Sequence, residues 1–180
     1  ETAAVAYHEA IPGHHLQVTI ASELTRLPNF QRFSFGNTAY VEGWALYTER
    51  LADEMGLYAT DLDRLGLLAG DSVRACRLVV DTGLHALGWS RQQAIDFMVA
   101  NVPTGLDQIE VEVDRYIAMP AQALSYKVGQ LEIQRLRAGA ADAAAAAGRP
   151  FDLKGFHDVV LGSGSLSLPV LREVVATWSS

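Results

Sequence analysis

The stretch His8-Glu9-Ala10-Ile11-Pro12-Gly13-His14-His15 is the part of this chain from which the rest can be interpreted. It places imidazoles and a carboxylate around a Pro-Gly dipeptide, which interrupts helices. Histidine and carboxylate side chains are the usual ligands of catalytic zinc, and a Glu directly after the first His acts on the metal-bound water. The stretch therefore predicts part of a zinc site, with His8 as a ligand and Glu9 as the general base.

The second histidine ligand is either His14 or His15. In the common HExxH motif the two histidines are four residues apart, whereas here the spacing is six or seven. On a straight helix, a residue seven positions after His8 points within roughly 20° of the same direction but lies about 10 Å further along the axis. Pro12 cannot donate a hydrogen bond to the carbonyl of His8, so we expect a break that lets either imidazole reach the ion. His14 is preferred because Gly13 before it permits an unusual backbone. The alternative is a kink that carries ordinary buried and surface side chains.

Composition and length limit the possible classes of protein. The 180 residues suit one domain covering residues 1–180, and 49% apolar residues can form a sizeable core. A net charge of −7 disfavours nucleic acid and anionic membranes as partners. No apolar run reaches the roughly 20 residues of a membrane span. Cys76 is the single cysteine, which excludes an internal disulfide and a cysteine-based zinc site.

The start of the chain is also informative. It begins at Glu1, without a Met, only a few residues before the histidine motif. We therefore expect a C-terminal part of a longer protein, whose N-terminal region would complete the cleft.

Cap residues and apolar spacing predict helices and no strand, so the expected class is all-α. The expected helices cover residues 2–11, 14–25, 38–55, 62–87, 91–102, 105–118, a long helix that begins with Pro120 as its first residue, 152–161, and a last helix from 168. Residues 25–37 are expected to form a loop, with Phe30, Phe33 and Phe35 as packing residues or the wall of a cleft.

The helix expected at 38–55 carries the candidate third ligand, Glu42. It lies among apolar neighbours, where a charge needs a partner, and Gly43 beside it allows another backbone to approach closely. A carboxylate on the helix after a histidine pair is the usual third ligand of such zinc sites. The alternative is a surface carboxylate, which is the interpretation given to Glu49 and Glu54.

Other candidate functional residues lie further along the chain. Arg77, Asp81 and His85 form one polar stripe, in which Asp81 could orient His85 or pair with Arg77; the alternative is a solvated face with a salt bridge. Tyr126 could donate a hydrogen bond to a developing oxyanion, and Arg115 could bind a substrate carboxylate. A purely structural role is the alternative for each.

Four motifs carry a resemblance to a known family. They are HEAIPGHHLQ (8–17), YVEGWALY (40–47), DTGLHALGWS (81–90) and RYIAMPAQALSYKVG (115–129). Through them, nearly the whole chain resembles the bacterial family catalogued as domain of unknown function 885. The resemblance implies a helical zinc-metallopeptidase domain, usually preceded by several hundred more residues. The motifs are also similar to those of Glu-zinc peptidases of the thimet oligopeptidase and dipeptidyl-peptidase III types. That likeness implies His8, His14 and Glu42 as ligands and Glu9 as the base.

These observations favour a zinc-dependent peptidase that acts on short peptides. Glu9 would move a proton from the zinc-bound water to the leaving amine, and Tyr126 or His85 would stabilise the oxyanion. A helical di-metal carboxylate protein would need Glu-x-x-His on two helices, and no His in the sequence has a Glu three residues before it. The remaining alternative is a non-catalytic helical domain with a structural or vestigial metal site.

Overall fold

The computed structural model describes residues 2–34 and 36–179, and all regular structure in these ranges is helical. The predicted all-α class is therefore confirmed. The helices are α1 (Thr2–Glu9), α2 (His14–Glu23), α3 (Asn29–Phe33), α4 (Thr38–Glu54), α5 (Asp61–Ala86), α6 (Arg91–Asn101), α7 (Leu106–Ala118), α8 (Ser125–Ala146), α9 (Leu153–Leu161) and α10 (Leu168–Ser179). Over the described ranges, no helix has the length and apolarity needed to cross a membrane.

Local cap chemistry explains most helix ends. Thr60 and Ser90 each form a capping box with the residue three positions later, at the starts of α5 and α6. Gly56 and Gly88 follow α4 and α5 with φ values of +70° and +71°, a conformation that favours glycine. These ends agree with the sequence predictions to within one or two residues.

Two predicted boundaries were wrong. Pro120 does not begin the long helix, because Ala121 adopts a φ of +69° and donates its backbone N–H to the carboxylate of Asp81, at 3.1 and 3.2 Å. The helix begins at Ser125 instead. The expected loop also contains the short helix α3, on which Phe30 and Phe33 are 71% and 55% exposed and so are not core residues. Phe35 lies outside the described residues.

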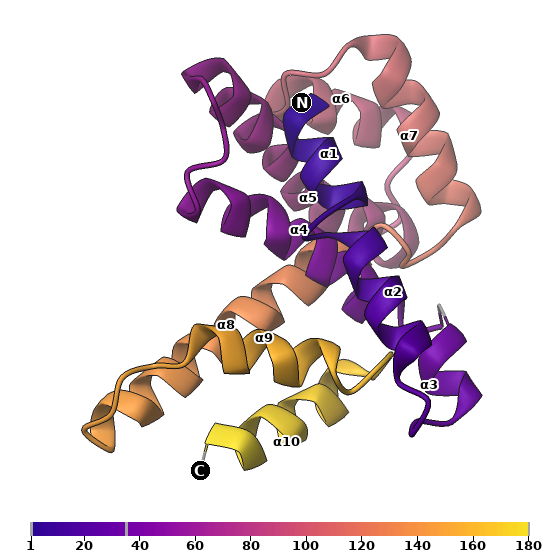
Figure 1. The fold of residues 1–180 in the computed structure, drawn as a ribbon. Helices are drawn as coiled ribbons and strands as arrows, with labels where there is room; N and C mark the ends of the chain where they lie inside the picture. The colour runs from indigo at the N-terminus through magenta and orange to yellow at the C-terminus, as the bar shows by residue number, and fades with distance from the viewer. Residues whose placement is uncertain (1, 35, 180) are drawn as a thin grey trace.

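Figure 1 shows α4 between two groups of helices, with α5, α6 and α7 on one side and α8, α9 and α10 on the other. Helices α4 and α8 make the closest packing. A Cβ atom at Gly43 would lie 2.4 Å from the backbone of Gly129, and one at Gly129 would lie 1.8 Å from the carbonyl oxygen of Ala39. The predicted close approach of another backbone at Gly43 is therefore confirmed.

The buried apolar side chains form separate clusters. One cluster joins α4 and α8 to α9 and α10 around Trp44, Tyr47 and Phe156. A second joins α5, α6 and α7 around Ile109, Val113 and other side chains. A smaller one attaches α1 to α4 and α5 through Ala4, Ala52 and Leu67. The first and third clusters hold the helices that carry the histidine motif and Glu42.

Candidate metal centre

The break after α1 brings the two histidines of the motif together. Helix α1 ends at Glu9 and α2 begins at His14, as predicted from Pro12. Gly13 lies so close to α1 that a Cβ atom there would be 1.9 Å from the carbonyl oxygen of His8, so only glycine fits. The indole N–H of Trp44 donates to the carbonyl of Pro12, at 3.0 Å, and ties the turn to α4. The turn is therefore held in place by contacts with α1 and α4.

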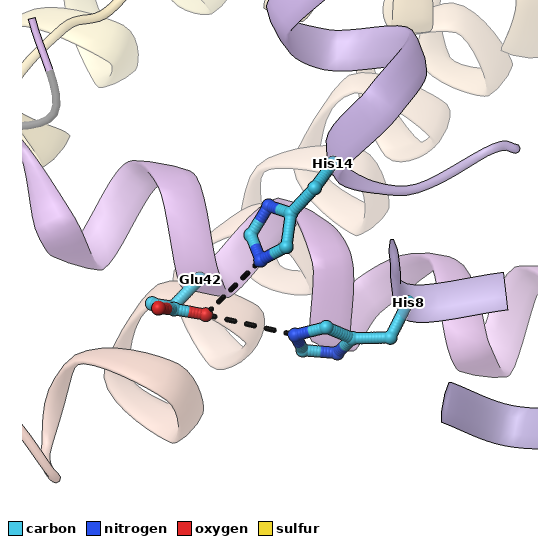
Figure 2. A group of neighbouring side chains, drawn as sticks. All are labelled: His8, His14 and Glu42. Carbon is cyan, nitrogen blue, oxygen red and sulfur yellow. Dashed lines mark hydrogen bonds and ion pairs between the residues drawn. The ribbon is translucent and has the colours of Figure 1, made fainter. Parts of the chain in front are cut away.

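Three side chains from three helices converge beside this turn. Glu42 Oε2 lies 3.2 Å from His14 Nε2 and 3.6 Å from His8 Nε2. Figure 2 shows both imidazoles facing the Glu42 carboxylate. The imidazole rings of His8 and His14 meet edge to face, with centroids 4.8 Å apart. Among residues 2–34 and 36–179, this is the one group of His, Cys, Asp or Glu side chains able to hold a metal ion, with its ligand atoms within 4.8 Å of one another.

His8 is oriented by a second carboxylate, Glu49. His8 Nδ1 lies 2.7 Å from Glu49 Oε1, and both side chains are buried. A proton on Nδ1 donated to Glu49 leaves Nε2 as a lone pair directed at Glu42. The prediction that Glu49 lies on the surface was therefore wrong. Its spacing of seven residues from Glu42 puts both carboxylates on nearly the same helix face, a signal that the sequence did contain.

The charges of the cluster are strongly coupled. Burial lowers the pKa of His8, but contacts with Glu42 and Glu49 raise it more, so its pKa lies above the ordinary value. Burial raises the pKa of Glu42, but His14 and His8 outweigh it and hold that pKa at about 2. Glu42 is therefore ionised, and the raised pKa of His8 means that the two carboxylates stabilise a positive charge at this imidazole. Such an arrangement favours a cation between the two groups.

The distances between the three ligand atoms can be compared with those of a zinc site. Two ligands that are each about 2.0–2.2 Å from a tetrahedral ion lie roughly 3.3 Å apart. The two His–Glu42 distances of 3.2 and 3.6 Å are close to that separation, whereas the whole group spans up to 4.8 Å, so side chains would have to move closer together around an ion. Two imidazoles with one carboxylate are a typical protein ligand set of catalytic zinc, and a carboxylate such as Glu49 behind a ligating histidine is its usual support.

Tyr126 also lies at the centre. Its ring stacks on that of His8 with centroids 6.3 Å apart, and its hydroxyl accepts a hydrogen bond from Gln122 Nε2 at 3.3 Å. The guanidinium of Arg77 lies 4.7 Å from the centroid of Tyr126 on the same ring. Arg115 is connected to Tyr126 through Gln122. Arg115 Nη1 donates a hydrogen bond to Gln122 Oε1 at 2.6 Å. Its other bonds are with Glu112, so its guanidinium is already paired with a carboxylate.

The side chains of the polar stripe of α5 make other contacts than those predicted. Arg77 and Asp81 are 8% and 2% exposed, so the alternative prediction that they lie on a solvated helix face was wrong. Arg77 bonds Glu112 and the hydroxyl of Tyr116, and Asp81 accepts from the backbone N–H of Ala121. His85 Nε2 lies 2.9 Å from the carbonyl oxygen of Tyr116. In the described part of the chain, neither Asp81–His85 nor Asp81–Arg77 forms a hydrogen bond or ion pair, and His85 has no contact with the metal centre.

The two remaining motif residues are exposed. Glu9 ends α1 next to His8, and no hydrogen bond or ion pair holds its carboxylate among residues 2–34 and 36–179. His15 is exposed on α2, whereas His14 is turned towards Glu42. The structure thus brings His14, and not His15, to the other candidate ligands.

Comparison with known proteins identifies the family of this chain. Residues 1–175 match the model of a family described as "Bacterial protein of unknown function (DUF885)". This chain belongs to that family. None of the curated proteins matches it.

Two solved structures are similar to the chain. The "putative lipoprotein from Colwellia psychrerythraea" is 44% identical with a TM-score of 0.92, over 98% of this chain and 30% of that one. The "putative lipoprotein of unknown function from Shewanella oneidensis" is 30% identical with a TM-score of 0.83, over 96% of this chain and 31% of that one. The chain therefore spans about 30% of the length of these structures.

Proposed function

We propose that this chain carries the metal centre of a zinc-dependent peptidase that acts on short peptides. The observation that supports it most is the convergence of His8, His14 and Glu42 from three helices, with ligand atoms within 4.8 Å of one another. A bound zinc would supply a positive charge that lowers the pKa of a water molecule to roughly 7 and polarises a substrate carbonyl. The same residue types occur in the Glu-zinc peptidases that the motifs resemble.

Glu9 has the position and freedom expected of the general base. A helical residue directly after His8 points about 100° away from it, so we expect Glu9 to act on a metal-bound water and not to be a ligand itself. Its exposed carboxylate has no partner among the described residues and can accept a proton from water and give it to the leaving amine. This freedom supports a catalytic role over a structural one.

Among the candidate substrate-binding groups, the contacts favour Tyr126 over His85 and Arg115. Tyr126 is the better donor to a developing oxyanion, because its ring stacks on His8 while His85 is bonded to the Tyr116 carbonyl. Arg115 could bind a peptide carboxylate only by sharing its charge with Glu112. Since the chain spans about 30% of the two similar structures, the activity is proposed for the full-length protein, in which an N-terminal region would complete the cleft.

Elemental analysis of two neighbouring histidine variants tests the metal centre. The full-length protein should contain one zinc per chain, and His14→Ala should lose it because one of three protein ligands is removed. His15→Ala is the matched control, since that exposed imidazole does not face Glu42, and it should keep its zinc. Stoichiometric zinc in His14→Ala would overturn the assignment.

A further inference from the structure

The helices that supply His14 and Glu42 also enclose a pocket. Its volume is about 240 Å³, and its walls come mainly from α2, α3 and α4, including Gln17, Val18, Ala21, Phe33, Tyr40 and Val41. Val18 lies four residues after His14, on the same face of α2. Val41 directly precedes Glu42 on α4. The pocket therefore lies about one helical turn from the candidate metal centre.

The size and lining of the pocket suit one apolar side chain. Val18, Ala21, Phe33 and Val41 supply apolar walls. An apolar cavity of about 150 Å³ can hold a benzene ring, whereas sites for whole drug-sized molecules are about 300–1,000 Å³. A cavity of about 240 Å³ lies between these sizes. It can take a side chain such as that of phenylalanine or leucine, but not a large free ligand.

Gln17 provides an independent sign that a ligand with polar atoms binds here. Its side chain is 4% exposed, and neither amide atom has a hydrogen-bond partner in the described part of the chain. Burial raises the pKa of the nearby Tyr40 phenol and the Gln17 amide lowers it, but the pair lacks hydrogen-bonding geometry. The Tyr40 hydroxyl donates instead to the Val160 carbonyl, at 3.0 Å. Buried amides are normally paired, so an unpaired one in the wall of a pocket points to a partner from outside the chain.

We propose that this pocket receives a phenylalanine- or leucine-sized side chain of the peptide, from a residue next to the cleaved bond. The Gln17 amide would pair with a peptide group of the same substrate. The statement about a cleaved bond rests on the proposed peptidase function, whereas the predicted binding of an apolar side chain depends only on the pocket. Together they define the substrates as short peptides with a large apolar residue beside the cleaved bond.

A pair of valine variants gives a matched test. Val18 and Val79 are 39% and 41% exposed, both are on helices, and only Val18 lines the pocket. In the full-length, zinc-loaded protein, Val18→Phe should reduce kcat/KM for peptides with Phe or Leu beside the cleaved bond by about 10- to 100-fold. It should leave peptides with Gly or Ala there nearly unchanged. Val79→Phe should behave like the unmodified protein, and zinc content should be equal in all three.

A binding measurement separates this proposal from the peptidase proposal. The valine methyl NMR signals of Val18 and Val41 should shift on addition of N-acetylphenylalanine amide and not of N-acetylglycine amide, and Val18→Phe should abolish the shift of Val41. Absence of these shifts, or equal losses for all peptides in Val18→Phe, would overturn the pocket assignment. Methyl shifts in a zinc-loaded protein that cleaves no peptide would support the pocket's binding role while overturning the peptidase function and the assignment to a cleaved bond.

Discussion

Two carboxylates lie next to His8 in different ways, and the difference separates their expected roles. Glu9 follows it in the sequence and is exposed without a partner among the described residues, whereas Glu49 comes from α4 and binds Nδ1 in a buried contact of 2.7 Å. A free carboxylate at a metal centre can transfer protons, while a buried one orients a ligand. Changing each of them to glutamine should therefore affect different properties.

Glu9→Gln should keep its zinc and lose most peptide turnover. Loss of the base that activates water typically costs about 10²–10⁴-fold in rate, while the ligands are untouched. The measurements are zinc content and kcat on a short-peptide library, made on the full-length protein. Unchanged kcat would remove Glu9 from the mechanism, and lost zinc would make it a ligand. Bound zinc without any turnover in the unmodified protein would favour the alternative, a structural or vestigial site.

Glu49→Gln should weaken zinc binding about 10- to 100-fold, because its carboxylate no longer fixes the orientation and basicity of His8. Competition with a zinc chelator measures the affinity. Glu54→Gln on the same helix is the control, since Glu54 is exposed and pairs with Arg137 away from the centre. Equal zinc affinity in the two variants would contradict a supporting role for Glu49.

At the scale of helices, two glycines set how closely α4 and α8 pack. Gly43 and Gly129 let the two backbones approach more closely than any side chain would allow. Gly43 directly follows Glu42, so the helix contact and the candidate ligand lie on neighbouring residues of α4.

Gly129→Ala should destabilise the protein by at least about 1–3 kcal/mol, since its Cβ would lie 1.8 Å from the carbonyl oxygen of Ala39 and the helices would have to separate. Gly139→Ala on the same helix is the matched control: nothing lies within 4 Å of its added Cβ. That variant should gain about 0.5–1 kcal/mol from helix propensity. Urea unfolding measures both free energies, and equal stability of the two variants would contradict the close-packing argument.

At the scale of the whole molecule, partly buried ion pairs connect helices in addition to the apolar clusters. Glu112 on α7 joins Arg77 on α5, Arg115 on its own helix and the hydroxyl of Tyr116. Burial raises the pKa of Glu112, but these donors and their charges lower it more, to about 2 from an ordinary 4.5. The group α5–α7 therefore depends on one ionised carboxylate.

The lowered pKa of Glu112 predicts how stability depends on pH. A carboxylate with a lowered folded-state pKa stabilises the protein above its unfolded value, near pH 4.5, and loses that contribution as the pH falls towards 2. Urea unfolding at pH 7 and pH 3 should show a loss for the unmodified protein that is about 1–3 kcal/mol larger than for Glu112→Gln. Glu110→Gln on the same helix should keep the full loss, because the Glu110 side chain is 45% exposed and its contact with Arg91 is 3.9 Å long. The same pH dependence in Glu112→Gln as in the unmodified protein would contradict the assignment.

Local sequence features determined the helices and the chemical nature of the site. Capping at Thr60 and Ser90, the glycine stops and the break at Pro12 depend on hydrogen bonds and sterics among near neighbours, so the sequence alone predicts them. The residue types of His8, His14 and Glu42 likewise predict a metal site before any fold is known, and the structure brings these three side chains together.

Contacts between residues distant in the sequence decided the remaining features of the site and of the helix boundaries. The choice of His14 over His15, the burial of Glu49, the pairing of Arg115 with Glu112 and the positive φ of Ala121 near Asp81 all depend on side chains or backbones that only folding brings together. A seven-residue spacing from Glu42 was compatible with both a buried and an exposed Glu49. Its burial follows from where α1 packs on α4, because that packing places His8 next to it and supplies the partner that a buried charge requires.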